Sequence, residues 1–205
     1  MMLPSRRLLL TLLAAATVRP NVVRAADADA VAPIEALDQG LLRAMQAGKS
    51  APFAQRYNAL LPVVERAFDL PAILRASVGP RWASIAPAEQ QQLLDVFRKF
   101  TVCSYVANFS AFGGERIEIV PGNRAIDADQ IVQTQIVASG DTTPIDYVMR
   151  RGANGWRAVD VLLNGSISQV AVNRSDWRAL LASGAGGLIA SLQRKVSDLS
   201  GGAIN

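Results

Sequence analysis

The spacing of apolar residues changes period twice along this chain, and that change constrains the fold more than any other feature. Between residues 33 and 112 apolar side chains recur every three or four positions, which is typical of amphipathic helices. Between residues 115 and 163 several runs alternate polar and apolar residues, as half-buried strands do. Helical spacing then returns near residue 176. Helices, then strands, then helices predict an α+β fold.

Six helical segments are expected from this spacing and from residues that start or stop helices. They are Pro33–Met45, Pro52–Phe68, Leu70–Ser77, a long helix that begins at Pro87 and ends before Gly113, Asp176–Leu181 and Leu188–Leu199. Because proline lacks the backbone N–H that a helix interior needs, Pro62 predicts a kink or a division of the second helix. The long helix is strongly aromatic, so one broad face of it must be buried.

Four β-rich runs are expected to form one sheet. They are Glu115–Val120, Gln130–Ala138, Pro144–Arg151 and Trp156–Leu163, with short turn clusters between them. Consecutive strands with such short links pair as an antiparallel meander. The sequence therefore predicts a four-stranded antiparallel sheet with helices packed against one face.

The first 25 residues have the build of a secretory signal peptide. Arg6 and Arg7 precede an apolar run, and Ala25 ends a small-residue cleavage site. The run is shorter than the roughly 20 apolar residues that span a bilayer. Cys103 lies far from the cleavage site, so cleavage exposes no amino-terminal cysteine for lipid attachment. We expect a signal peptide over 1–25 and a single domain over 26–205, free in the periplasm.

Charge and composition exclude several classes of function. The full chain has 21 basic and 17 acidic residues, and four of the basic ones lie before residue 26, so the remaining domain is balanced and nucleic acid is not an expected partner. The chain has no histidine, which removes Ser-His-Asp and Cys-His catalysis and histidine metal sites. With a single cysteine, thiolate metal clusters are excluded too. We therefore expect no catalytic residues, no metal and no cofactor, and Cys103 as a small buried hydrophobe.

Two aspartates within predicted strands are the candidates for acid–base chemistry. Strand alternation places Asp146 on the face opposite Ile145 and Tyr147, toward solvent. The same alternation places Asp160 on the face of Trp156 and Ala158, which indicates a buried, hydrogen-bonded structural group.

Several short motifs, in this order, resemble those of one family. They are Arg56-Tyr57, Leu61-Pro62 and Phe68-Asp69, then Val78–Trp82, then Pro87–Gln90, then Gly155–Ser168, and finally Arg174–Trp177 and Gly186–Ile189. Together the motifs resemble the MlaC or toluene-tolerance proteins, which carry phospholipids through the periplasm of Gram-negative bacteria and include a hopanoid-associated branch. The resemblance covers nearly the whole domain. Ala158 and Cys103 depart from the family's usual residues.

The resemblance implies a curved four-stranded sheet, a helical layer, and lipid tails in an apolar cavity between them. It also implies a phospholipid or hopanoid-like ligand, passed between an inner-membrane ABC-type transport complex and an outer-membrane lipoprotein complex, and no enzymatic activity. Lining residues are expected from the long helix and the sheet. They are Leu74, Phe97, Phe100, Tyr105, Phe109, Tyr147, Val159 and Val161.

Two other functions are compatible with the same residues. An α+β enzyme of the isomerase or dehydratase kind would use the cavity with an inward aspartate. A periplasmic adaptor would have a solid core and only a protein partner. Lipid that co-purifies with the protein favours the carrier over both.

Overall fold

The helical spacing before residue 113 forms four α-helices in the computed structural model, which describes residues 28–122 and 124–204. They are α1 (Ala28–Ala47), α2 (Phe53–Ala67), α3 (Leu70–Val78) and α4 (Pro87–Asn108), with the 3-10 turns η1 (Gly48–Ser50) and η2 (Gly79–Ser84). Of the two expected outcomes at Pro62, a division of α2 is wrong, because the helix runs through this residue. Pro62 has no backbone N–H, so one hydrogen bond of the helix is missing there. The helix is held by its tertiary packing, since its neighbours Leu60, Val63 and Val64 are buried.

The sheet has six strands, not the four expected. They are β1 (Arg116–Ile119), β2 (Arg124–Ile126), β3 (Asp129–Ala138), β4 (Asp141–Gly152), β5 (Gly155–Leu163) and β6 (Ile167–Ser168). The four long runs pair antiparallel in the order β1-β3-β4-β5, β6 extends the β5 edge, and β2 pairs with β3. The two unexpected strands have three and two residues, too few to show an alternating pattern.

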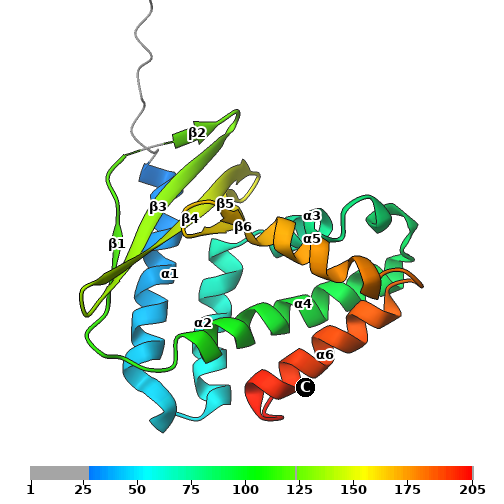
Figure 1. Cartoon of the computed structure of the whole chain (residues 1–205), viewed down its shortest axis with the longest axis horizontal. Helices are drawn as coiled ribbons and strands as arrows, with labels where there is room; N and C mark the ends of the chain where they lie inside the picture. The colour runs from blue at the N-terminus through cyan, green and yellow to red at the C-terminus, as the bar shows by residue number, and fades with distance from the viewer. Residues whose placement is uncertain (1–27, 123, 205) are drawn as a thin grey trace, which may run out of the picture.

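Part of the helical layer covers one face of this sheet, and the rest lies beside the sheet (Figure 1). Helix α1 packs across β1, β3, β4 and β5, and α2 lies beside it. The remaining helices, α5 (Gln169–Leu180) and α6 (Gly186–Ser200), pack with α3 and α4 to one side of the sheet. Helix α5 begins seven residues before the expected Asp176, because the side chain of Ser168 caps it by accepting a hydrogen bond from the backbone N–H of Ala171 at 3.0 Å.

An irregularity between β4 and β5 changes which residues of β5 face the helices. Met149 is paired with Ala158 but Val148 with Asp160, so Val159 is an extra residue in β5. Strict alternation therefore fails at this point. Ala158 and Val161, three positions apart, both pair with residues on the helical face of β4, whereas Asp160 pairs on the other face. The expectation that Asp160 shares a face with Ala158 was wrong for this reason.

Asp146 lies on the face opposite Tyr147, as expected, but it is not exposed to solvent. Its exposed fraction is 2 %, and its Oδ2 atom lies 4.0 Å from Nη1 of Arg124 in β2. The turn at Gly165 also packs against this carboxylate. Burial raises the pKa of Asp146. Strand β2 and this turn cover the outer face of the sheet at Asp146. The alternation of residues in β4 predicts which face a side chain is on, but it does not predict that another segment covers that face.

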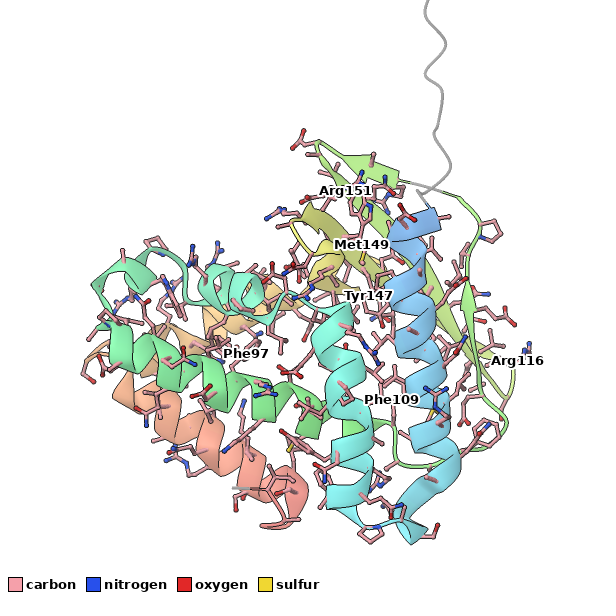
Figure 2. All side chains as sticks on the ribbon, turned by 180° about the vertical axis from the view of Figure 1, so that it is seen from behind. Phe97, Phe109, Arg116, Tyr147, Met149 and Arg151 are labelled. Carbon is pink, nitrogen blue, oxygen red and sulfur yellow. The ribbon has the colours of Figure 1, made fainter. Side chains whose placement is uncertain are left out.

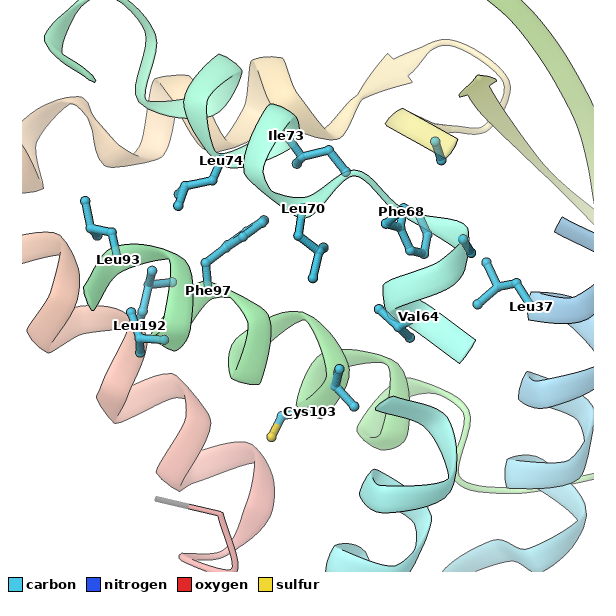
Figure 3. Close-up of a cluster of buried hydrophobic side chains, with 14 of the residues drawn as sticks. Leu37, Val64, Phe68, Leu70, Ile73, Leu74, Leu93, Phe97, Cys103 and Leu192 are labelled. Atoms are coloured by element: carbon cyan, nitrogen blue, oxygen red, sulfur yellow. The ribbon is translucent and has the colours of Figure 1, made fainter. Parts of the chain in front are cut away.

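The apolar core lies between the helices and continues onto the inner face of the sheet. Figure 3 shows Leu74 pointing into the cluster around Leu93 and Phe97, and Cys103 pointing toward α6. Leu74 and Cys103 are both fully buried, which confirms the expected environment of the cysteine. None of the helices in the described ranges is both long enough and apolar enough to cross a bilayer.

Candidate functional site

An apolar pocket of about 340 Å³ lies where α3, α4 and α5 meet β4 and β5. Its walls are mainly aromatic and aliphatic, from the α2–α3 junction, α4 and the two strands. The apolar lining residues are Phe68, Leu70, Ile73, Phe97, Phe100, Tyr105, Phe109, Ile145, Tyr147, Val161 and Leu163. Five uncharged polar side chains complete the lining, which are Thr101, Ser104, Asn108, Gln169 and Asn173.

The structure brings six of the eight expected lining residues to this one pocket. They are Phe97, Phe100, Tyr105, Phe109, Tyr147 and Val161. Figure 2 shows Phe97 and Phe109 at separate points along α4 and Tyr147 on the sheet. Their contact with a lipid stays a prediction.

Leu74 and Val159 do not line the pocket, which corrects their assignment. Leu74 turns from α3 into the solid core, where its exposed fraction is 0 %. Val159 is the extra residue of β5 and pairs with no residue of β4. It therefore does not follow the alternation that brings Val161 to the pocket.

The sequence reasoning missed the part of the wall that comes from the α2–α3 junction. The backbone N–H of Asp69 donates to the carbonyl oxygen of Ala158 at 2.9 Å, and Phe68 bridges to Ala158 beside it. Oδ1 of Asp69 also accepts from the N–H of Ala72 at 3.0 Å and so caps α3. These bonds tie the junction to β5 and fix Phe68, Leu70 and Ile73 at the pocket. Ile145 was missed as well, although it shares the face of Tyr147 by simple alternation.

Four aromatic rings cluster at one wall of the pocket. The ring of Phe68 lies 5.7 Å from that of Tyr105 and 6.1 Å from that of Tyr147, and Phe109 stacks on Tyr105 at 5.9 Å. The hydroxyls of Tyr105 and Tyr147 are hydrogen-bonded to each other, and burial raises the pKa of both phenols. Because each hydroxyl has a polar partner, the rings can present apolar surface to the pocket without an unpaired polar group.

A buried carboxylate, Asp38 of α1, lies close to these tyrosines and was also missed. Its exposed fraction is 5 %, and its Oδ1 atom has no hydrogen-bond partner among the described residues. Burial, with a smaller effect of Glu35, raises the pKa of Asp38 to about 7. The charge of Asp38 in turn raises the pKa of Tyr105 and Tyr147. Asp38 follows Ile34 and Leu37 on the buried stripe of α1. A carboxylate at a position where the helical spacing predicts an apolar residue was the sign in the sequence that Asp38 is buried.

Neither of the two aspartates first considered for chemistry reaches the pocket. Asp146 is on the outer face of the sheet, and Asp160 accepts hydrogen bonds from Ser168 and Val170 at the start of α5. In the described ranges no three acidic or cysteine side chains come together as metal ligands. The geometry is that of a binding pocket, with mainly hydrophobic walls and a few uncharged polar side chains.

Fold and site together define an α+β protein with an apolar pocket between an antiparallel sheet and a helical layer. The model of one family, described as MlaC protein, matches residues 35–194. Since this span is most of the chain, the protein belongs to the MlaC family.

A solved structure with the same fold is the phospholipid-binding protein from Ralstonia solanacearum, determined in complex with a phospholipid. Its TM-score with this chain is 0.73 at 19% sequence identity, over 84% of this chain and 99% of that one. At this identity the likeness establishes the fold. No curated protein matches the sequence.

Proposed function

We propose that this protein is a periplasmic lipid carrier that holds a phospholipid, or a similar lipid, with its tails in the pocket. The observation that carries the proposal is the pocket itself, with apolar walls and polar side chains only from α4 and α5. Membership of the MlaC family supports it, as does the phospholipid bound by the Ralstonia solanacearum protein of the same fold.

The hydrophobic effect gives such a pocket enough affinity without a strong polar contact. Each buried methylene contributes about 0.8 kcal/mol, so ten of them contribute about 8 kcal/mol before the cost of immobilising the chain. A lipid held in this way leaves slowly into water, which suits a carrier. Delivery then requires an acceptor that binds the lipid-free or open state better.

The proposed route runs between two membrane assemblies. An inner-membrane ABC-type transport complex and an outer-membrane lipoprotein complex would exchange lipid with the carrier. Export would depend on the signal peptide over 1–25, which lies outside the described residues. Amino-terminal sequencing of the protein from a periplasmic extract should then begin close to Ala26, and a membrane-bound form that keeps Leu8 to Leu13 would contradict the proposed location.

Native mass spectrometry with lipid extraction tests the carrier directly. We expect the purified protein to carry lipid with acyl chains in a defined ratio, and the delipidated protein to take up phospholipid from vesicles. A protein that neither co-purifies with lipid nor takes it up would overturn the proposal.

The buried acid Asp38 favours a second candidate function, an isomerase or dehydratase that uses the same pocket. A carboxyl with a pKa of about 7 beside two tyrosine hydroxyls resembles a general acid–base group with hydrogen-bond donors. Asp38 is not among the pocket-lining residues, however, so a substrate would reach it only past the tyrosine pair. Asp38→Asn should leave lipid uptake intact in a carrier, whereas loss of a turnover with intact lipid uptake would favour the enzyme.

A further inference from the structure

We infer that an arginine-lined recess at the hairpin end of β4 and β5 is a docking site for an acidic segment of a partner protein. Arg66, Arg151 and Arg157 pair with the carboxylates of this segment, and the indole N–H of Trp156 donates a hydrogen bond to one of them. The recess is separate from the apolar pocket, so the inference goes beyond lipid carriage and does not depend on it.

The recess is an open hollow of about 590 Å³ where the start of α1 and the end of α2 meet the β4–β5 hairpin. Its charged lining residues are Asp29 of α1, Arg66 of α2, Arg151 of β4 and Arg157 of β5. Three basic residues outnumber one acidic residue, so the recess is positively charged and attracts anionic groups. The apolar pocket, in contrast, has no charged residue in its described lining.

The three guanidinium groups are available to a ligand. Among the described residues no carboxylate lies within 4.0 Å of any of them. The Nε atom of Arg66 donates to the carbonyl oxygen of Pro62 at 3.1 Å, and its two Nη atoms carry further donors. Arginine has five N–H donors and no acceptor, and it keeps its charge at physiological pH. The partner of this recess must therefore be rich in negatively charged acceptors.

Trp156 adds a donor that lacks an acceptor. This residue lines the recess with an exposed fraction of 8 %, and its Nε1 atom has no hydrogen-bond partner among the described residues. It pairs with Arg151 across the β4–β5 ladder, so both side chains lie on the same face of the sheet. A buried indole N–H normally has a partner, and a ligand oxygen in the recess is the acceptor that Trp156 needs. Since this nitrogen is itself buried, the recess must close around the ligand for the bond to form.

The spread of the donors favours a protein segment as the ligand. The arginines come from three different elements, so a ligand must present several oxygens at separate points around the recess. A single inorganic anion pairs with only part of this set. A flat bilayer surface does not enter a recess that is lined by a buried side chain. Neighbouring aspartate and glutamate side chains of one segment meet both requirements, and arginine binds their carboxylates through two parallel hydrogen bonds.

A partner in the recess leaves the apolar pocket uncovered. On the β4–β5 ladder Ile145 pairs with Leu163 at the pocket, whereas Arg151 pairs with Trp156 at the recess. Arg151 is six residues beyond Ile145, which is roughly 20 Å along an extended strand. Figure 2 shows Tyr147, Met149 and Arg151 in order along the sheet, with Arg151 at the end away from Phe109.

A capped hexaglutamate peptide tests the site on the purified protein. The readout is the NMR signal of the Trp156 indole N–H, which moves when this group gains an acceptor. The variant is Arg151→Gln combined with Arg157→Gln, and its control is Arg178→Gln combined with Arg194→Gln, which removes the same charge at exposed positions of α5 and α6. We expect the peptide to shift the signal in the wild type and in the control, and to bind the variant at least about tenfold more weakly.

A Trp156 signal that does not move in the wild type would overturn the inference, as would equal affinities of the variant and the control. Sodium phosphate and vesicles of dioleoyl phosphatidylglycerol are the comparison ligands. If phosphate reproduces the shift and displaces the peptide at equal concentration, the recess is a site for a small anion. If the vesicles shift the signal and the peptide does not, the recess is a membrane contact, and either result replaces the protein partner. Failure of the lipid-carrier proposal gives a different result, because the peptide binds whether or not the protein takes up lipid.

Discussion

Val161 of β5 lies directly opposite Tyr147 of β4 in the antiparallel ladder, and both side chains line the pocket. Val161→Trp should therefore place its larger ring in space that a ligand would occupy. We expect co-purified lipid to fall at least severalfold while the Tm of the lipid-free protein drops only modestly. Lipid extraction and thermal melting of the same sample measure the two effects.

The matched control is Ala158→Trp, on the same strand and the same face of the sheet. Ala158 is fully buried against Phe68, so overpacking there should cost roughly 1–3 kcal/mol or more of folding stability. If Val161→Trp unfolds the protein as readily as Ala158→Trp does, the space beside Val161 is packed core and the carrier proposal loses its pocket.

Asp38 should make the stability of the protein depend on pH. Its pKa is about 7 in the folded protein and near 3.8 when unfolded, so the folded state binds the proton more tightly. The contribution of Asp38 to the free energy of unfolding is then highest below pH 4, falls as pH rises toward 7 and levels off above it, by about 4 kcal/mol for a shift of this size. Asp38→Asn should flatten this slope and be more stable than the wild type at pH 8.

Denaturant unfolding at pH 5 and pH 8 measures this slope. Glu35→Gln, an exposed change on the same helix, should leave most of it in place. A wild-type protein equally stable at both pH values would show that Asp38 is ionised at little cost in the fold.

Asp160→Ala should lower stability, because three donors lose their acceptor. They are the N–H groups of Val161 and Val170 and the hydroxyl of Ser168. We expect a loss of about 1–3 kcal/mol in denaturant unfolding. The control Asp176→Ala, at an exposed position of α5, should change little. An Asp160→Ala variant that keeps its full stability would contradict the structural role of this carboxylate.

Cys103 should be unreactive toward thiol reagents in the native protein. Its side chain is fully buried, and burial raises the pKa of the thiol to about 11, so very little thiolate forms at pH 8. Labelling with a chromogenic disulfide reagent should proceed only as denaturant unfolds the chain. Rapid labelling of the folded protein would contradict the buried environment between α4 and α6.

The sequence by itself determined the fold class, the approximate position of the long elements other than α5, and one face of the pocket. Helical spacing predicts Phe97, Phe100 and Tyr105 along α4 and Phe109 at its end as pocket residues, and alternation places Tyr147 on the inner face of β4. These inferences held because the period of a helix or strand is local, so neighbouring residues fix which side chains share a face. The family was recognisable too, since the order of its short motifs is a property of the sequence.

The tertiary structure alone decided which of those faces are covered, and by what. Asp146 is buried because β2 and the turn at Gly165 cover it, and Leu74 belongs to the core because α3 packs against α4 and α5. Val159 does not line the pocket, because β5 has one extra residue where it pairs with β4. Beyond Ala158 the side chains of β5 therefore face the opposite sides from those that strict alternation predicts. Such outcomes depend on partners distant in the chain, and a local period carries no information about them.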